Sequence, residues 1–350
     1  METQNNNNEL VLVTGGSGFV ALHAIRQLLD EGYQVRATVR SLKRKDEIVT
    51  SLKNAGISEF ENLQLVETDL SADAGWNEAM KNVDHVLHIA SPIFLRLPKT
   101  EEEMIRPAVD GTLRVLKAAR DAGVKRVVMT SNFGAVGYSH RDPSILITEE
   151  IWTDPNEKGL SAYNKSKVLA ESAAWDFIRK ESNGPELTVI NPVAILGPSF
   201  SEKLSSGFEL LKNILDGSMK AIPNIELAIV DVRDLVDLHI RAMKSIEAKG
   251  ERFLALSGGT MTLPEIAEFL KKNRPEVSAK ISGKVLADWQ VRLAALFSKK
   301  AKAIVPLIGI NRKASNEKAK KILGWQPRTK EDAILATVDS LLKFKQIKTS

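Results

Sequence analysis

A glycine-rich turn near the start of the chain is the feature that most constrains its fold. Residues 14–19 read Thr-Gly-Gly-Ser-Gly-Phe and stand between a short run of Val and Leu and an amphipathic helical pattern. Between a strand and a helix, such glycines let the backbone approach a pyrophosphate, and the helix N-terminus offers N–H groups to it. A tight turn without a ligand is the alternative, and Ala21 replaces the usual third glycine. We expect a dinucleotide to contact Gly15, Gly18, Phe19 and Val20.

Strand and helix patterns alternate through the first two hundred residues. Short apolar runs, typical of buried strands, occupy residues 10–14, 34–39, 63–68, 85–91, 126–131 and 187–191. Longer helical patterns occupy residues 19–31, 101–121 and 161–181, and Gly32 and Gly123 stand where helix C-terminal caps are expected. The alternation predicts an α/β fold with a doubly wound parallel sheet.

Beyond Pro192 the pattern becomes irregular, with clusters of Gly, Pro and Ser. Two further runs, residues 227–235 and 253–257, are expected to be strands, and the chain is expected to return to the main sheet there. The predicted division is a disordered tail over 1–8, a dinucleotide-binding domain over 9–191 plus the returning strand near 224–257, and a smaller C-terminal substrate-binding lobe over 192–223 and 258–350.

Composition excludes several classes of protein. The 350 residues include no cysteine, so disulfides, thiolate metal sites and cysteine nucleophiles are absent. His85 and His88 have no acidic or histidine cluster beside them, so we expect no metal. The net charge is +5, and the Lys and Arg residues are scattered among 44 acidic residues, which argues against nucleic acid as a partner. No secretory signal or 18-residue apolar run is present, so we expect a cytoplasmic protein without a membrane partner.

The end of the second predicted strand indicates which dinucleotide is bound. Sites for NAD carry an acid there that binds the ribose hydroxyls, whereas this chain has Val39 followed by Arg40. Arg40, Lys43 and Arg44 would attract a 2′-phosphate, so the sequence favours NADPH over NADH. A solvated basic loop is the alternative. After the third strand, Asp69 and Leu70 are expected near the adenine, although Asp69 could instead cap a helix.

The chemistry is expected from a tyrosine and a lysine. Tyr163 and Lys167 are four residues apart in a helical pattern, so they face the same side of the helix. A cation beside a phenol favours the phenolate and eases proton transfer near neutral pH. The pair follows the fifth strand of a dinucleotide fold, which favours a catalytic pair over an incidental one.

With these motifs the chain resembles the extended short-chain dehydrogenases/reductases, and among them the dihydroflavonol-reductase-like and methylglyoxal-reductase-like carbonyl reductases. The matching segments are residues 14–19, 35–40, 69–70, 89–92, 130–131, the Tyr163 and Lys167 pair, and 191–192. The resemblance implies a Rossmann domain and NADPH-dependent reduction of an aldehyde or ketone. It also implies a monomer or homodimer, and further cofactor contacts from Ala90, Ser91, Thr130, Pro192 and Val193.

The chain departs from this family at the catalytic serine. The usual Thr-Ser-Ser trio here reads Thr130, Ser131 and Asn132, so either Ser131 or the Asn132 amide would hold the substrate oxygen. An apolar wall for a small-molecule carbonyl substrate is expected from Ile93, Phe94, Phe133, Phe200 and Phe208. The alternatives are an NAD-dependent sugar-nucleotide epimerase or dehydratase, which shares the fold and the Tyr-Lys pair, and a non-catalytic dinucleotide sensor, which would be expected to lose that pair.

Overall fold

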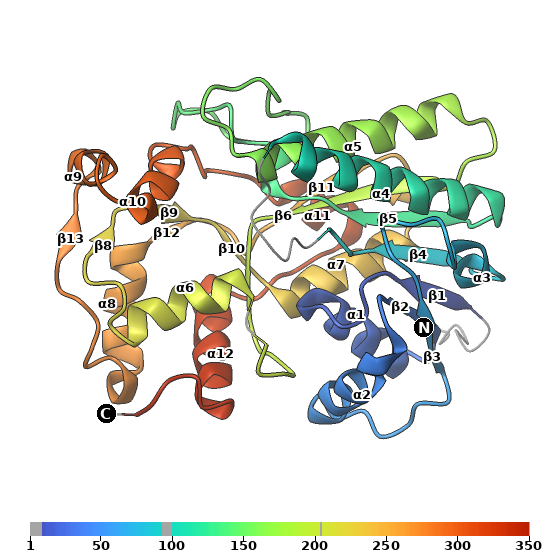
Figure 1. The fold of residues 1–350 in the computed structure, drawn as a ribbon, viewed down its shortest axis with the longest axis horizontal. Helices are drawn as coiled ribbons and strands as arrows, with labels where there is room; N and C mark the ends of the chain where they lie inside the picture. The colour runs from blue at the N-terminus through green and yellow to red at the C-terminus, as the bar shows by residue number, and fades with distance from the viewer. Residues whose placement is uncertain (1–8, 93–99, 204, 350) are drawn as a thin grey trace.

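Seven parallel strands form the central sheet of the protein (Figure 1). The computed structural model describes residues 9–92, 100–203 and 205–349. The sheet order is β11-β6-β5-β4-β1-β2-β3, so the chain changes direction across the sheet between β1 and β4. This arrangement confirms the predicted doubly wound α/β fold. The strands are β1 (Leu10–Val13), β2 (Gln34–Val39), β3 (Leu63–Glu67), β4 (His85–His88), β5 (Arg126–Thr130), β6 (Glu186–Pro192) and β11 (Arg252–Ala255).

Helices cover both faces of this sheet because neighbouring residues of each strand point to opposite sides. Val11 and Val13 of β1 pack on one face, whereas Leu12 packs on the other. The first face is covered by α1 (Phe19–Asp30), α2 (Lys45–Asn54), α7 (Val232–Lys244) and α11 (Glu317–Leu323). The second face is covered by α3 (Trp76–Met80), α4 (Glu102–Asp121) and α5 (Ala162–Lys180).

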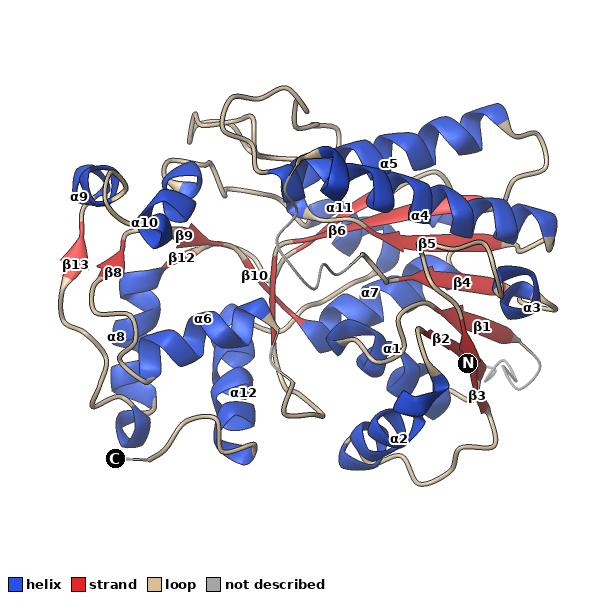
Figure 2. Cartoon of the chain, in the orientation of Figure 1, coloured by secondary structure: helices blue, strands red, loops and turns tan. Residues whose placement is uncertain are grey.

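A smaller lobe with its own apolar core lies beside the sheet (Figure 2). Its helices are α6 (Ser206–Leu215), α8 (Leu263–Asn273), α9 (Asp288–Ala294), α10 (Lys299–Ile304) and α12 (Lys330–Lys343). Three short strand pairs accompany them: β7 (Ala194–Leu196) with β10 (Ile229–Asp231), β8 (Ile222–Pro223) with β13 (Val285–Leu286), and β9 (Glu226–Leu227) with β12 (Met261–Thr262). Each lobe has its own core, and the chain passes between the two lobes several times.

The strand predicted over residues 227–235 is wrong beyond Asp231. The helix α7 begins at Val232, and Asp231 caps it by accepting a hydrogen bond from the Arg233 N–H at 2.9 Å. An apolar run in a buried helix resembles a buried strand in sequence, and the cap was the signal that separated them. The strand that returns to the main sheet is β11, which pairs with β6.

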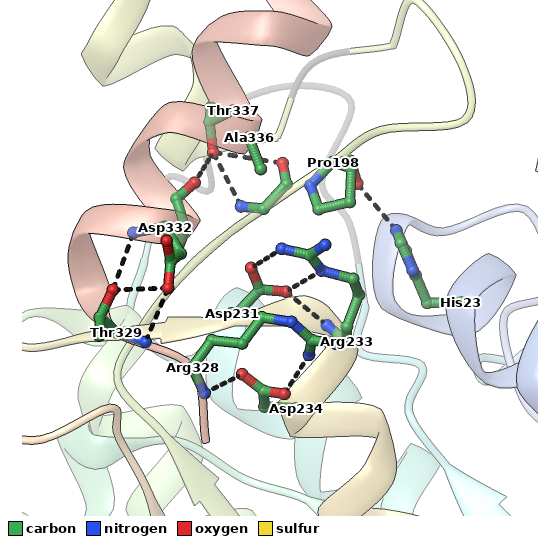
Figure 3. A network of polar contacts seen from close by, with 12 residues as sticks. His23, Pro198, Asp231, Arg233, Asp234, Arg328, Thr329, Asp332, Ala336 and Thr337 are labelled. Atoms are coloured by element: carbon green, nitrogen blue, oxygen red, sulfur yellow. Dashed lines mark hydrogen bonds and ion pairs between the residues drawn. The ribbon is translucent and has the colours of Figure 1, made fainter. Parts of the chain in front are cut away.

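Polar contacts join the two lobes where their elements meet (Figure 3). The ring of His23 in α1 donates to the Pro198 carbonyl at 2.8 Å. The carboxylate of Asp234 in α7 accepts from the Arg328 backbone N–H at 2.7 Å and also binds the Arg328 side chain. These contacts fix the segment before α12 against α7, and they hold the lobes side by side.

Trp325 lies late in the chain and packs in the core beside the central sheet. Its replacement tests how much this late segment stabilises the fold. Its side chain is 0% exposed in the core on the first face of the sheet, and its indole N–H donates to the Asp234 carbonyl at 2.9 Å. We expect Trp325→Ala to lower the free energy of unfolding by about 3–5 kcal/mol, because a large cavity forms and a buried acceptor loses its donor. Urea unfolding followed by circular dichroism measures the change.

A matched control is Trp289→Ala, because Trp289 in α9 is 66% exposed. An exposed tryptophan should change the free energy of unfolding by less than about 0.5 kcal/mol. Equal losses of unfolding free energy in Trp325→Ala and Trp289→Ala would contradict a stabilising role for the burial of Trp325 in the core.

Candidate active site

A cavity of about 1360 Å³ opens at the carboxyl ends of the parallel strands. Its wall includes residues that follow β1, β2, β3, β4, β5 and β6, and residues from the smaller lobe. In doubly wound sheets, ligands bind at this edge, where the strand order reverses. The cavity therefore has the position and the size of a site for a dinucleotide together with a second molecule.

The glycine turn forms one wall of the cavity, where close backbone packing requires the glycines. Gly15 has a φ of +75°, and a Cβ there would stand 3.0 Å from the Ala90 Cβ. A Cβ on Gly16 would stand 2.8 Å from the Ala37 Cβ. Gly18 precedes α1, and Phe19 and Val20 of its first turn line the cavity. The N-terminus of α1 thus faces the space where a pyrophosphate would lie.

The basic residues predicted to bind a 2′-phosphate separate into two groups. Arg40 and Arg44 line the cavity, whereas Lys43 does not. Arg44 also forms an ion pair with Glu47 at 2.9 Å, so part of its charge is already balanced. Arg40 at the end of β2 is therefore the main candidate for phosphate recognition.

Asp69 lines the cavity together with Leu70. Its carboxylate accepts hydrogen bonds from the Ser71 N–H at 2.8 Å and from the Ser71 hydroxyl at 2.7 Å. The hydrogen bond from the Ser71 N–H is the main reason that the pKa of Asp69 is lowered. Asp69 therefore shapes the local turn and remains ionised at the edge of the cavity.

Tyr163 and Lys167 are brought to the same cavity by α5. Ser161 caps this helix by accepting from the Asn164 N–H at 3.1 Å, so Tyr163 lies in the first turn. Tyr163 is 51% exposed, and the Lys167 Nζ lies 5.8 Å from its ring centroid. The same Nζ donates to the Ser91 hydroxyl at 3.1 Å. The phenol is thus accessible from the cavity, while the ammonium group is held between it and the segment after β4.

The trio at the end of β5 presents buried polar atoms that lack partners. Within the described residues, the Ser131 hydroxyl and the Asn132 Oδ1 have no hydrogen-bond partner, and both residues line the cavity. Buried polar atoms are rarely left in this state unless a ligand or water satisfies them. Together with the glycine cradle, these atoms fit a site that holds a dinucleotide and an oxygen of a second molecule.

A buried network behind the trio was missed at the sequence level. Asn191 in β6 donates to the Asn132 carbonyl at 3.2 Å and to the Glu171 carboxylate at 2.8 Å. Arg252 in β11 donates to the other oxygen of Glu171 at 2.6 Å. Glu171 follows Lys167 by four residues on α5, and that spacing was the signal for its position on the same helix face.

Two buried histidines adjoin the strand ends as neutral rings. His239 in α7 donates from Nδ1 to the Leu235 carbonyl and accepts at Nε2 from the Thr130 hydroxyl, each at 2.7 Å. Burial lowers the pKa of His239 to about 4 and that of His88 to about 3. Among the described residues, no group of three or more His, Cys, Asp and Glu could hold a metal ion.

The remaining predicted residues have different positions. Ala90, Ser91, Thr130, Pro192, Val193 and Phe133 line the cavity. Phe200 does not, since it stacks on His23 with ring centroids 4.0 Å apart, and Phe208 is buried in the core of the smaller lobe. Ile93 and Phe94 lie outside the described residues. Further residues of the cavity wall were also missed, because they come from irregular segments; they include Tyr138, Arg141, Leu160, Leu227, Ile310 and Arg312.

Comparisons with known proteins agree with this geometry. Residues 11–255 match the model of the NAD dependent epimerase/dehydratase family. Cinnamoyl-CoA reductase 1 of Petunia hybrida is 36% identical over 277 residues, which cover 77% of this chain and 78% of that protein. The yeast methylglyoxal/isovaleraldehyde reductase Gre2 in complex with NADPH superposes with a TM-score of 0.80, at 27% identity over 96% of this chain and 99% of Gre2. Gre2 of Candida albicans with NADPH gives 0.79, at 28% identity and the same coverage.

The buried histidines predict how stability depends on pH. Burial also lowers the pKa of His23 to about 4, so the unfolded chain binds more protons than the folded protein between that value and the ordinary 6.5. The stability that these rings contribute is complete above pH 6.5 and is lost as the pH falls. Urea unfolding at pH 7.5 and 5.5 should show a loss of about 1.4 kcal/mol for each ring. Between these two pH values, the variant His23→Gln should lose less unfolding free energy than the wild type, by the share of one ring. A wild-type stability that rises on acidification would contradict the assignment of neutral rings.

Proposed function

This chain belongs to the NAD dependent epimerase/dehydratase family, and from that premise we propose that it reduces an aldehyde or ketone to an alcohol with NADPH. The observation that carries the proposal is the meeting of Tyr163 and Lys167 with the glycine turn and Ser131 in one cavity. The family match confirms the resemblance that the sequence motifs indicated. The NADPH complexes of Gre2, which superpose along nearly the whole chain, support the same cofactor.

The glycine turn and the first turn of α1 would hold the pyrophosphate, with Arg40 on the 2′-phosphate and Lys167 near the ribose. When bound, the reduced nicotinamide supplies a hydride to the carbonyl carbon of the substrate. Tyr163 gives its hydroxyl proton to the carbonyl oxygen, and solvent replaces that proton. The product is an alcohol and the oxidised dinucleotide.

Ser131 is the better candidate to hold the carbonyl oxygen. The carbonyl oxygen needs a hydrogen-bond donor, and the unpartnered hydroxyl of Ser131 can donate. The buried unpartnered atom of Asn132 is its amide oxygen, which can only accept, so Asn132 would have to hold the carbonyl oxygen through its Nδ2. The backbone carbonyl of Asn132 accepts from Asn191 and fixes the path of the chain after Ser131.

The alternatives gain no support from the site. An NAD-dependent epimerase would favour an acid at the end of β2, where this chain has Val39 and Arg40. A dinucleotide sensor has no need of the accessible phenol of Tyr163. None of the described helices is long and apolar enough to cross a bilayer. We also propose that the protein is a cytoplasmic monomer or homodimer and that its substrate is a small molecule.

Removal of the phenol tests the proton donor. We expect Tyr163→Phe to lower kcat by about two to four powers of ten, since general acid catalysis is lost. The Kd for NADPH, measured by fluorescence titration, should change less than about threefold because the glycine turn is unaffected. Tyr33→Phe, at a tyrosine buried in the core beneath α1, is the control and should keep its turnover. Near-native turnover in Tyr163→Phe would remove the proposed mechanism.

Replacement of Arg40 tests the choice of cofactor. We expect Arg40→Ser to lower kcat/KM for NADPH by roughly 10- to 100-fold, because a charge-assisted hydrogen bond to phosphate is lost. The kcat/KM for NADH, which has no 2′-phosphate, should stay within about threefold. An equal loss with both cofactors would show that Arg40 does not read the phosphate.

A further inference from the structure

Arg312 is a buried arginine in the cavity wall with no acceptor for its N–H groups. The residue is 8% exposed and lines the cavity. Within the described part of the chain, its guanidinium makes no hydrogen bond or ion pair, and its Nε is buried without a partner. A guanidinium carries five N–H donors, and removing even the one on Nε from water without an acceptor is costly.

Two aromatic rings hold this guanidinium. Its central carbon lies 4.6 Å from the ring centroid of Tyr138 and 5.6 Å from that of Phe133. Such stacking stabilises the charge but supplies no hydrogen-bond acceptor, so the buried Nε–H stays unsatisfied and the Nη groups remain available to a ligand in the cavity. Phe133 directly follows Ser131 and Asn132 in the chain, so its ring connects Arg312 to the part of the cavity wall that contains the trio.

The backbone around Arg312 is rigidly fixed, although it belongs to no helix or strand. Asn311 donates from its side chain to the carbonyls of Asp142 and Ile145, at 2.8 and 2.7 Å. Lys313 accepts at its carbonyl from the Ile147 N–H at 2.9 Å. The residues on both sides of Arg312 are therefore tied to one loop, residues 138–149. A buried charge held in this way is preorganised for a ligand, because it needs no reordering on binding.

The charge of the cavity wall is positive. Arg141 and Lys158 line the cavity as Arg312 does, while Asp69 and Glu157 are the acids of the cavity wall within the described residues. Asp69 follows β3, and neither Glu157 nor Arg312 forms an ion pair among the described residues. An anion that enters the cavity therefore meets a field of the opposite sign in a space partly closed from water.

We propose that the natural substrate carries a carboxylate at the end opposite its reactive carbonyl, and that Arg312 binds this carboxylate. The inference rests on the proposed function, since it assigns the substrate class of the same site. A single buried guanidinium matches the single charge and the two oxygens of a carboxylate. The planar fork of Arg312 would bind both oxygens while Phe133 and Tyr138 pack against the rest of the molecule.

Matched pairs of substrates test this inference. We would measure kcat/KM with NADPH for 4-formylbenzoate and 4-oxobutanoate and for their methyl esters, which keep the carbonyl but lack the charge. The acids should be preferred by about 10-fold or more. Arg312→Met, which keeps an apolar side chain between the rings, should lose roughly 10- to 100-fold on the acids and stay within about threefold on the esters. Equal kinetics for acids and esters in both pairs would overturn the inference.

Control variants separate charge recognition from damage to the fold. Arg312→Lys keeps the charge without the fork and should retain part of the preference for the acids. Arg106→Met, at an exposed arginine of α4, should leave all four rates unchanged. Thermal unfolding of each variant is measured alongside. A uniform loss on acids and esters in Arg312→Met would assign Arg312 to structure alone and overturn the inference.

A binding measurement distinguishes failure of this inference from failure of the proposed function. Isothermal titration of the protein loaded with NADP⁺ would compare 4-(hydroxymethyl)benzoate with its methyl ester, in the wild type and in Arg312→Met. If no carbonyl is reduced but the acid binds in an Arg312-dependent way, the reductase proposal fails and the carboxylate site stands. If the aldehydes are reduced but the acid and ester bind equally, the reductase proposal stands and the carboxylate site fails.

Discussion

The buried carboxylate of Glu171 is the contact on which the geometry of the site depends. It is 0% exposed, and it accepts from Asn191 of β6 and Arg252 of β11 while standing on the same helix as Tyr163 and Lys167. Breaking a buried pair of this kind leaves an uncompensated charge and is strongly destabilising. The ion pair between Glu171 and Arg252 therefore fixes the rotation of α5 over the sheet. Since Asn191 also binds the Asn132 carbonyl, one carboxylate positions both the phenol and the residues that would face it.

The electrostatics of the cavity follow a consistent division. The histidines next to the strand ends are kept neutral by burial, so they shape the wall without adding charge. Among the cations of the wall, Arg40 and Lys167 belong to the elements expected to hold the dinucleotide, whereas Arg312 stacks on Tyr138 and Phe133. The polar atoms between them, at the end of β5, have unfilled hydrogen-bonding capacity. A molecule with an anionic group at one end and a carbonyl at the other would complement this arrangement.

Features with a local cause could be predicted from the sequence, and features with a long-range cause could not. The glycine turn, the strands of the main sheet and the spacing of Tyr163 and Lys167 each arise within a few residues, and the structure has them at the expected places. Arg312 reaches the cavity only because its segment pairs with a loop more than 150 residues earlier, and no local pattern records that pairing. For the same reason, an aromatic in an irregular region could not be assigned: Phe208 turned inward to the lobe core, whereas Phe133 faces the cavity.

The position of Trp325 has a consequence for the order in which the molecule is assembled. Its indole fills a core whose other members include Val11 and Val13 at the start of the chain. Contacts between such distant residues form late, because the intervening chain must first be ordered. During synthesis on a ribosome, the dinucleotide-binding half would emerge well before Trp325, which completes its apolar core. Its apolar interior would stay incomplete for that interval, which makes this half a candidate client for molecular chaperones while the smaller lobe is still being translated.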